Sequence, residues 1–287
     1  MRRTRYAALL VLLLAGCAAA PSKPIAPSAA VPADDNLNAV AWTQTAVEHD
    51  LVYREVYRDA EEKLAAALAD PTWDALPRDE RGNSVASLPP AVILDIDETV
   101  LDNSPYAARL VRDGKEFDAS SWALWCKEGI AKPLPGALAF TRAAAARGVA
   151  VFYLSNRTQD LNAATLANLR ADGFPVAGED SFLGLGTLVP GCAQVGSEKG
   201  CRRKLIAQRY RVLMQFGDQL GDFLDVLDNT PNGRVAAVQP YLDWVGQRWF
   251  VLPNPTYGSW EPALFGNDGA QPLPQRRAAK RAALRVQ

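Results

Sequence analysis

The chain has 287 residues, 48% of them hydrophobic, and a formal net charge of −1, which suits one large α/β domain with an insertion or two small domains. This balanced charge argues against a surface that binds a nucleic-acid polymer. The single histidine, His49, excludes metal sites that need two imidazoles and HExxH peptidases. We expect His49 to be a surface or packing residue of a helix.

Residues 1–17 predict a bacterial lipoprotein signal peptide, because a basic start is followed by an apolar run too short to span a membrane as a mature helix. The run ends in LAGC at residues 14–17, which resembles a lipobox with Cys17 as the lipidated residue. An ordinary secretory signal is the alternative. Ala18 after the cysteine predicts the outer membrane, and the Ala- and Pro-rich segment 18–37 predicts a flexible tether.

The folded domain is predicted to comprise residues 38–265. Residues 38–70 have apolar positions at helical spacing and predict one or two helices that pack outside the sheet or against a cap. The segment 102–135 is too long for an ordinary strand-to-helix loop, so it predicts an inserted helical cap. Residues 266–287 form a basic tail that we expect to be disordered, with a weak helix touching anionic lipid as the alternative.

An apolar strand is predicted at residues 91–94, directly before Asp95 and Asp97. Alternate residues of an extended chain point the same way, so both carboxylates can reach one pocket at the carboxyl edge of the sheet. Two acids in such a place need compensation, and a bound cation provides it.

Three later segments also place polar side chains at the end of a predicted strand or at the start of a predicted helix. A predicted strand at 149–154 leads to Ser155, which is well placed to donate to a phosphate oxygen or to cap a helix. Lys199 stands at the start of a predicted helix, and the strand 211–216 precedes Asp218 and Asp222. The four segments that carry Asp95 with Asp97, Ser155, Lys199, and Asp218 with Asp222 together predict one polar site. Further short strands are predicted within 174–188, at 235–238 and at 249–252.

The string DIDETVLDNSPY at residues 95–106 resembles the first motif of haloacid-dehalogenase-type (HAD) phosphatases, and within them the bacterial class C acid phosphatases, the surface lipoprotein 5′-nucleotidases. SNR at 155–157, GDQLGDF at 217–223 and PNPTYGSWE at 253–261 resemble the later motifs of that class. Gly196, Gln219 and Gly221 depart from the class pattern. The resemblance covers about residues 39–265.

The resemblance implies a fold and a set of roles. The fold is a Rossmann-like HAD core of the α/β class, with a central, mostly parallel sheet and a small helical cap. Asp95 is the nucleophile, Asp97 the general acid and base, and Ser155 and Lys199 hold the phosphoryl group. Mg²⁺ takes oxygens of Asp95, of the Asp97 carbonyl and of Asp218. Asp222 supports the metal or orients Lys199, and the substrate is bound by Asn103, Arg157 and Tyr257.

The predicted function is a metal-dependent acid phosphatase that hydrolyses nucleoside monophosphates through an aspartyl-phosphate and is held at the membrane by its lipid. A homodimer is left open. The alternatives are a phosphatase or phosphotransferase for other small phosphomonoesters and a non-catalytic ligand-binding lipoprotein. Cys192 and Cys201 either pair or remain free thiols, because an exported protein permits disulfides without requiring this one.

Overall fold

The computed structural model describes residues 35–82 and 84–287. The predicted signal peptide, Cys17 and nearly all of the predicted tether lie outside the described residues. Within the two described ranges, none of the helices combines the length and the apolar character needed to cross a bilayer.

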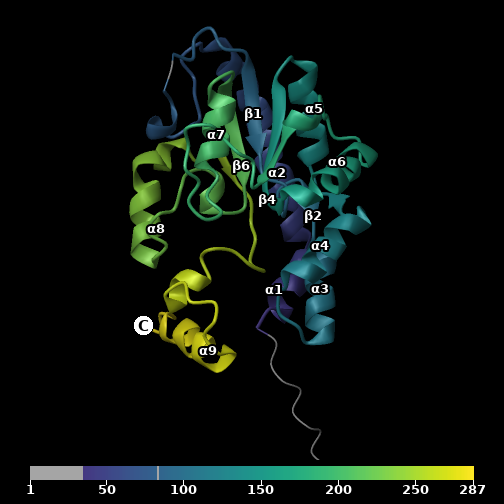
Figure 1. The fold of residues 1–287 in the computed structure, drawn as a ribbon, viewed down its shortest axis with the longest axis vertical. Helices are drawn as coiled ribbons and strands as arrows, with labels where there is room; N and C mark the ends of the chain where they lie inside the picture. The colour runs from purple at the N-terminus through teal and green to yellow at the C-terminus, as the bar shows by residue number, and fades with distance from the viewer. Residues whose placement is uncertain (1–34, 83) are drawn as a thin grey trace, which may run out of the picture. The chain divides into compact units, whose positions relative to one another are not determined.

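A five-stranded parallel sheet forms the centre of the structure, in the order β5-β4-β1-β6-β7 (Figure 1). Its strands are β1 (Pro90–Leu94), β4 (Ala150–Thr158), β5 (Phe182–Leu185), β6 (Arg211–Gly217) and β7 (Trp249–Val251). The predicted α/β class with a parallel sheet is confirmed. Because β1 lies between β4 and β6, the residues that follow these three strands meet at one edge of the sheet.

Helices cover both faces of the sheet, as the continuous apolar strands require. Val92 and Leu94 of β1 pack into one cluster with the helices α2 and α5, whereas Ala91 and Ile93 point into a second cluster with α7. The helices around the sheet are α2 (Val47–Ala69), α5 (Ala137–Ala146), α6 (Asn162–Ala171), α7 (Gly200–Ala207) and α8 (Pro231–Val238). Short 3-10 turns occur along the same part of the chain: η1 (Arg78–Glu80), η2 (Gln159–Leu161), η3 (Glu179–Ser181), η4 (Leu220–Asp222), η5 (Gln239–Trp244) and η6 (Pro262–Phe265).

A small cap is inserted after β1, where the long segment 102–135 predicts one. It contains a two-stranded antiparallel sheet and two helices: β2 (Leu101–Asp102), β3 (Lys132–Pro133), α3 (Ser104–Asp113) and α4 (Ala119–Glu128). Asp118 caps the start of α4 by accepting bonds from the backbone N–H groups of Ser120 and Ser121, at 2.9 and 3.2 Å. Helix α1 (Leu37–Thr45) contacts α3 and lies beside it in Figure 1, whereas α2 packs on β6 and β7 and so belongs to the core.

The structure differs from the sequence predictions in two places. Residues 235–238, predicted as a strand, are the end of α8, whose start is capped by Thr230. The tail predicted to be disordered contains helix α9 (Leu273–Ala282). Ion pairs hold α9 to the rest of the chain, among them Arg276 with Glu116 at 2.7 Å and Lys280 with Glu261 at 2.7 Å.

Candidate active site

The turn after β1 is held in place by hydrogen bonds with strand β6 and with helix α2. The backbone N–H of Asp95 donates to the carbonyl of Phe216 at 2.9 Å, which ties the turn to β6. The hydroxyl groups of Tyr53 and Tyr57 donate to the carbonyls of Glu98 and Thr99, at 2.5 and 2.7 Å. These two tyrosines are buried, and they also hold the loop that carries the acids.

Lys199 joins three elements at the sheet edge. Its ammonium group donates to Asp95, to Asp222 at 2.7 Å and to the carbonyl of Leu154 at 2.7 Å. Burial lowers the pKa of Lys199, but the carboxylates of Asp222 and Asp95 outweigh burial and leave this pKa above its ordinary value. The ammonium group therefore stays charged beside Asp95.

Three carboxylates gather around this lysine. Oxygens of Asp95, Asp218 and Asp222 all lie within 4.8 Å of one another. Burial, reinforced by the neighbouring acids, raises the pKa of Asp95 and of Asp218 well above the ordinary range, and Lys199 offsets part of this rise for Asp95. Asp218 accepts bonds only from neutral amides among the described residues, those of Gln219 at 2.6 Å and of Asn254 at 2.8 Å.

This donor set fits a divalent cation. The cluster contains one ammonium group and three carboxylates, of which Asp95 and Asp222 are buried and Asp218 is half-buried, so it carries an excess of negative charge that a cation would neutralise. An oxygen-only set suits Mg²⁺. Asp222, predicted to support the metal or to orient Lys199, lies in the same cluster as Asp95 and Asp218 and accepts from Lys199. The carboxylate of Asp97 is bonded to Arg157 outside this cluster, and its carbonyl is the predicted metal ligand.

Asp97 accepts hydrogen bonds from three side chains. Ser155 Oγ donates to it at 3.0 Å, Asn103 Nδ2 at 2.9 Å and Arg157 Nη2 at 2.8 Å. Asn103 and Arg157 are predicted to bind substrate, but both are buried and engaged with Asp97 here. Ser155, predicted to hold the phosphoryl group, is also bonded to Asp97.

Sequence reasoning missed the arginines behind Lys199. Arg202 donates to the Ser155 carbonyl at 2.6 Å and to Asn156 Oδ1 at 2.7 Å, which ties α7 to the end of β4. Arg203 is fully buried and paired with Glu80 at 2.6 Å and with Asp225 at 2.8 Å. The signal was the arginine doublet three and four residues after Lys199, on a helix that must bury one face.

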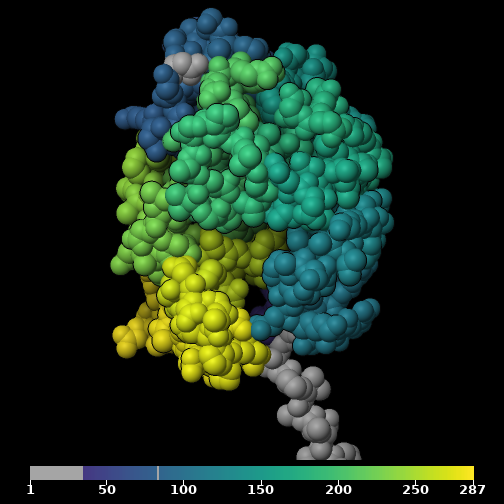
Figure 2. Space-filling view, viewed as in Figure 1, coloured from purple at the N-terminus to yellow at the C-terminus, as the bar shows by residue number. Residues whose placement is uncertain are grey.

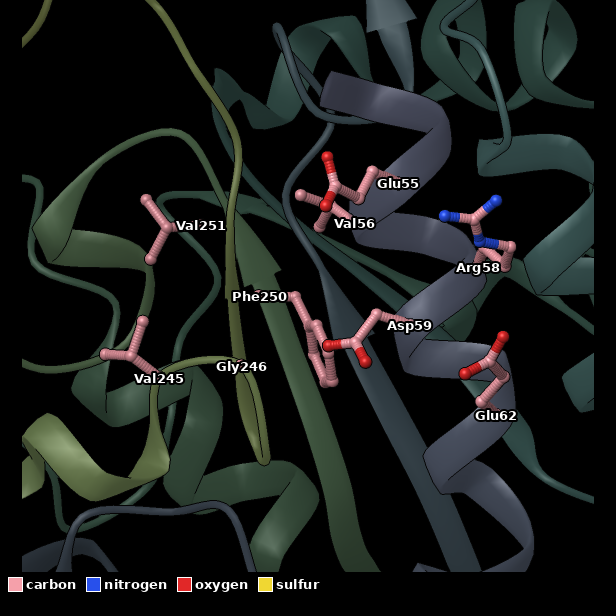
Figure 3. Close-up of a pocket in the computed structure, with 9 residues that line it drawn as sticks. All are labelled: Glu55, Val56, Arg58, Asp59, Glu62, Val245, Gly246, Phe250 and Val251. Carbon is pink, nitrogen blue, oxygen red and sulfur yellow. The ribbon is translucent and has the colours of Figure 1, made fainter. Parts of the chain in front are cut away.

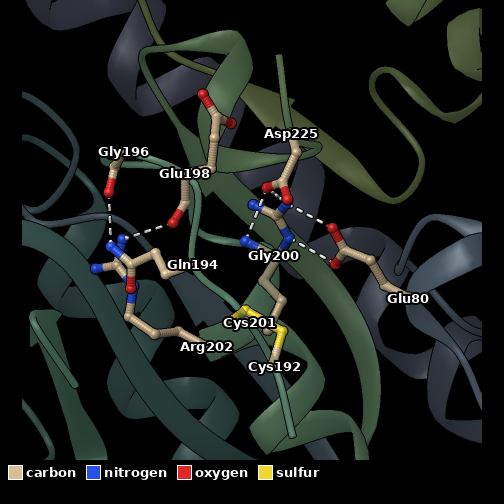
Figure 4. The surroundings of a disulfide bond; sticks show 10 residues. Glu80, Cys192, Gln194, Gly196, Glu198, Gly200, Cys201, Arg202 and Asp225 are labelled. Carbon is tan, nitrogen blue, oxygen red and sulfur yellow. Dashed lines mark hydrogen bonds and ion pairs between the residues drawn. A yellow bond between two sulfur atoms is a disulfide. The ribbon is translucent and has the colours of Figure 1, made fainter. Parts of the chain in front are cut away.

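A disulfide closes the loop before α7. Cys192 and Cys201, whose pairing the sequence left open, are bonded at 2.03 Å (Figure 4). In the same view the carboxylate of Asp225 faces the backbone N–H of Gly200, which donates to it at 2.8 Å at the start of α7. The disulfide and the hydrogen bond between Gly200 and Asp225 hold the chain on both sides of Lys199.

The site opens into a cavity of about 610 Å³. The acids and Lys199 line its inner part, and its outer wall is formed by cap residues and by the segment after β7. The cap supplies Tyr106, Leu110, Phe117 and Trp122, and the segment after β7 supplies Thr256, Tyr257, Gly258, Ser259, Glu261 and Pro262. Figure 2 shows the surface hollowed between the cap, in blue, and the yellow C-terminal segment.

A hydrogen bond between Tyr257 and Glu98 connects the segment after β7 to the turn after β1. The Tyr257 hydroxyl donates to Glu98 Oε2, and the backbone N–H of Asn103 donates to Glu98 Oε1 at 2.8 Å. Burial, with the nearby charge of Asp97, raises the pKa of Glu98 to about 8. The predicted substrate residue Tyr257 therefore lies at the cavity and also contacts the catalytic turn.

A second hollow, of about 500 Å³, lies between α2 and the segment that contains β7 (Figure 3). Glu55, Asp59 and Glu62 line it on the α2 side, and Val245 and Val251 face them. It contains none of the predicted site residues, and its acids do not suit a phosphate.

A family model matches residues 19–260, and it describes subfamily IIIB of the HAD superfamily, acid phosphatase. Among solved structures, the class C acid phosphatase from Bacillus anthracis with tungstate bound is 32% identical, with a TM-score of 0.76 over 88% of this chain and 97% of that one. The predicted family and fold are confirmed.

Curated plant proteins are similar over a shorter stretch. The stem 31 kDa glycoprotein of Glycine max is 30% identical over 166 residues, which are 58% of each chain. Acid phosphatase 1 of Solanum lycopersicum is 26% identical over 165 residues, which are 58% of this chain and 57% of that protein. The chain thus spans less than two thirds of the length of these curated relatives.

Proposed function

The chain belongs to subfamily IIIB of the HAD superfamily, the acid phosphatases, and from this premise we propose that it hydrolyses phosphomonoesters through an aspartyl-phosphate on Asp95. The observation that carries the proposal is the position of Asp95. It lies at the end of β1, beside the charged Lys199 and within the three-carboxylate cluster. Phosphoryl transfer needs this combination of a fixed nucleophile and positive charge around the moving oxygens.

The first step transfers the phosphoryl group to the protein. A carboxylate oxygen of Asp95 attacks phosphorus, and the ester P–O bond breaks with its electron pair going to the leaving oxygen. Asp97 gives that oxygen a proton, so the alcohol leaves neutral. Because this task needs the protonated carboxyl group, we expect higher activity at mildly acidic pH.

The second step returns the protein to its starting state. Asp97, now a carboxylate, takes a proton from water as the water oxygen attacks phosphorus. The bond between phosphorus and the Asp95 oxygen breaks, and inorganic phosphate and the Asp95 carboxylate are released. Lys199 stays close to Asp95 and offsets charge on the phosphoryl oxygens, and Mg²⁺ held by Asp95, Asp218 and Asp222 would supply further positive charge when bound.

Nucleoside monophosphates are the proposed substrates. The support is the aromatic outer wall of the cavity, where Tyr106, Phe117 and Trp122 of the cap face the segment that carries Tyr257. Aromatic rings stack on nucleobases, and such stacking is worth about 1–3 kcal/mol per base. The neighbouring Bacillus anthracis structure holds tungstate, an oxyanion with the shape of phosphate, which supports an oxyanion site at the inner end.

The proposed location is the outer membrane, through a lipid on Cys17. Its support is the sequence alone: the lipobox that ends in Cys17 predicts the lipid, and Ala18 predicts the outer membrane.

Phosphate release tests the activity and the substrate together. The purified protein is assayed at mildly acidic pH with Mg²⁺ or with EDTA, on a nucleoside monophosphate and on an aryl phosphate. We expect release from both substrates that EDTA abolishes. No release from either, by folded protein with metal present, contradicts the proposal.

Two variants of Tyr257 test the base contact. Tyr257→Ala removes the ring and should raise KM for the nucleotide more than for the aryl phosphate. Tyr257→Phe keeps the ring and loses only the bond to Glu98, so it should keep the substrate preference. Equal effects of both variants on the two substrates contradict a nucleobase contact at this residue.

A further inference from the structure

Helix α4 of the cap touches two of the three buried side chains that donate to Asp97, namely Asn103 and Arg157. Trp125 Nε1 donates to Asn103 Oδ1 at 2.8 Å, and the guanidinium group of Arg157 lies over the ring of Trp122, 5.5 Å from its centre. Trp125, Asn103 and Arg157 are each exposed by 3% or less, so water does not replace these contacts. The cap and the acid are thus connected through only one intervening residue on each path.

The contact from Trp125 decides which way the Asn103 amide points. An indole N–H is only a donor, so the end of the amide that faces α4 must be the oxygen. The amide nitrogen then faces Asp97 and donates to Oδ1 at 2.9 Å. The reverse orientation would place the amide oxygen against the carboxylate and the NH₂ group against the indole N–H.

One other group acts on the same oxygen. Arg157 Nη2 donates to Asn103 Oδ1 at 3.3 Å, a longer contact than the 2.8 Å of Trp125. Without the indole N–H, the amide oxygen would keep only this longer contact, and the amide nitrogen would keep Asp97 and the Leu101 carbonyl, which accepts from it at 3.4 Å. The preference for this amide orientation would therefore be weaker. Asp97 would then spend part of its time without the Asn103 donor, and its carboxyl group would be less well directed.

We infer that Trp125 is a positioning residue for the general acid, acting on Asp97 through Asn103. The inference rests on the proposed function, in which Asp97 protonates the leaving oxygen. It assigns the cap a part in the chemical step in addition to enclosing the cavity. Trp125 is not among the residues that line the cavity, and its indole N–H is bonded to Asn103, so we expect its effect on the reaction to pass through its neighbours.

The dependence of rate on the leaving group tests this inference. An alkyl phosphate needs its leaving oxygen protonated, whereas a nitrophenyl phosphate releases a stable phenolate that does not. The measured quantity is kcat/KM, because it reports phosphoryl transfer even when hydrolysis of the intermediate limits turnover. General acid catalysis contributes about 10²–10⁴-fold, so loss of its alignment should cost about 10-fold on the alkyl ester.

Trp125→Phe keeps an aromatic ring and removes the indole donor together with the five-membered ring that carries it; the Trp73→Phe control below makes the same change in ring size. We expect it to lower kcat/KM about 10-fold for the alkyl phosphate and less than about 3-fold for nitrophenyl phosphate. Trp73→Phe is the matched control, since Trp73 Nε1 donates to the Leu213 carbonyl at 2.8 Å, far from Asp97 in the hydrogen-bond network. In this control, kcat/KM should change by the same factor for both substrates.

A second variant covers the case in which Trp125→Phe does not fold. Asn103→Leu has a similar volume, lacks the amide and should show the same split between the two substrates. If the variants lower kcat/KM equally for both substrates while Asp97→Asn lowers it more for the alkyl phosphate, the inference is overturned and the proposed function stands. If Asp97→Asn itself shows no split, the acid role of Asp97 fails, and the inference falls with it.

Discussion

Replacement of Lys199 by methionine removes the only ammonium group that contacts the carboxylate cluster among the described residues. Lys199 is 4% exposed and donates to Asp95, to Asp222 and to the Leu154 carbonyl. Methionine fills much of the same volume but leaves two buried carboxylates without their partner. We expect Lys199→Met to lower the free energy of unfolding of the metal-free protein.

The size of the loss follows from these contacts. Removing one partner of a buried ion pair costs about 3–5 kcal/mol, because the remaining charge stays buried. Burial already raises the pKa of Asp95, and without Lys199 it rises further. The folded variant then binds protons more tightly than the unfolded chain, so acid favours its folded state. The deficit should therefore shrink as pH falls from neutral, by at most about 1.4 kcal/mol per pH unit for each proton.

Urea unfolding in EDTA, at neutral pH and at mildly acidic pH, measures this deficit. Lys204→Met is the matched control, because Lys204 lies half-buried on the same helix α7 and outside the cluster. We expect a large loss for Lys199→Met that is smaller in acid and little change for Lys204→Met. A deficit that is the same at both pH values, or equal losses in the two variants, would refute the reasoning.

Three further predictions concern the disulfide, Glu98 and the metal cluster. Cys192→Ser opens a disulfide between residues nine apart and should lower the free energy of unfolding by about 2–3 kcal/mol, with no further loss when a reductant is added. Because the folded pKa of Glu98 is about 8 against 4.5 for a free glutamate, ionisation destabilises the wild type as pH rises through this range. The Tm of Glu98→Gln relative to wild type should therefore increase from mildly acidic to mildly alkaline pH, and a constant difference contradicts the assignment. Asp218→Asn should weaken Mg²⁺ binding at least about 10-fold in a calorimetric titration, and unchanged affinity would remove Asp218 from the cluster.

The sequence predicts the strand ends of the site well because their signals are local. The apolar run before Asp95 is observed as β1, and the run before Asp218 is observed as β6. Parallel strands bring their carboxyl ends to one edge whatever the loops do, so Asp95, Lys199, Asp218 and Asp222 could be brought together without knowledge of the packing.

The contacts of long side chains could not be predicted in the same way. Arg157 directly follows the Ser-Asn pair and was expected at the substrate, but its buried guanidinium group reaches Asp97, sixty residues earlier in the chain. Arg203 pairs with Glu80 across 123 residues, and no periodicity encodes such a pairing. These directions depend on the packing of α7 and of the cap.

Two elements were missed for different reasons. Residues 235–238 are apolar enough to suggest a strand, but Thr230 and Pro231 provide a helix start that decides the local structure. Helix α9 has a polar composition that suggests disorder. It is held by ion pairs such as Arg276 with Glu116, which lies 160 residues away.

The central claim is that Asp95 becomes phosphorylated during turnover. The direct measurement mixes the Mg²⁺-loaded protein with a nucleoside monophosphate, quenches it in acid within the first turnover and examines the peptide containing Asp95 by mass spectrometry. We predict the added mass of one phosphoryl group on Asp95 in the wild type, and neither this mass nor turnover in Asp95→Asn. Phosphate release by Asp95→Asn at a near-normal rate, with no phosphorylated peptide in the wild type, would contradict the account.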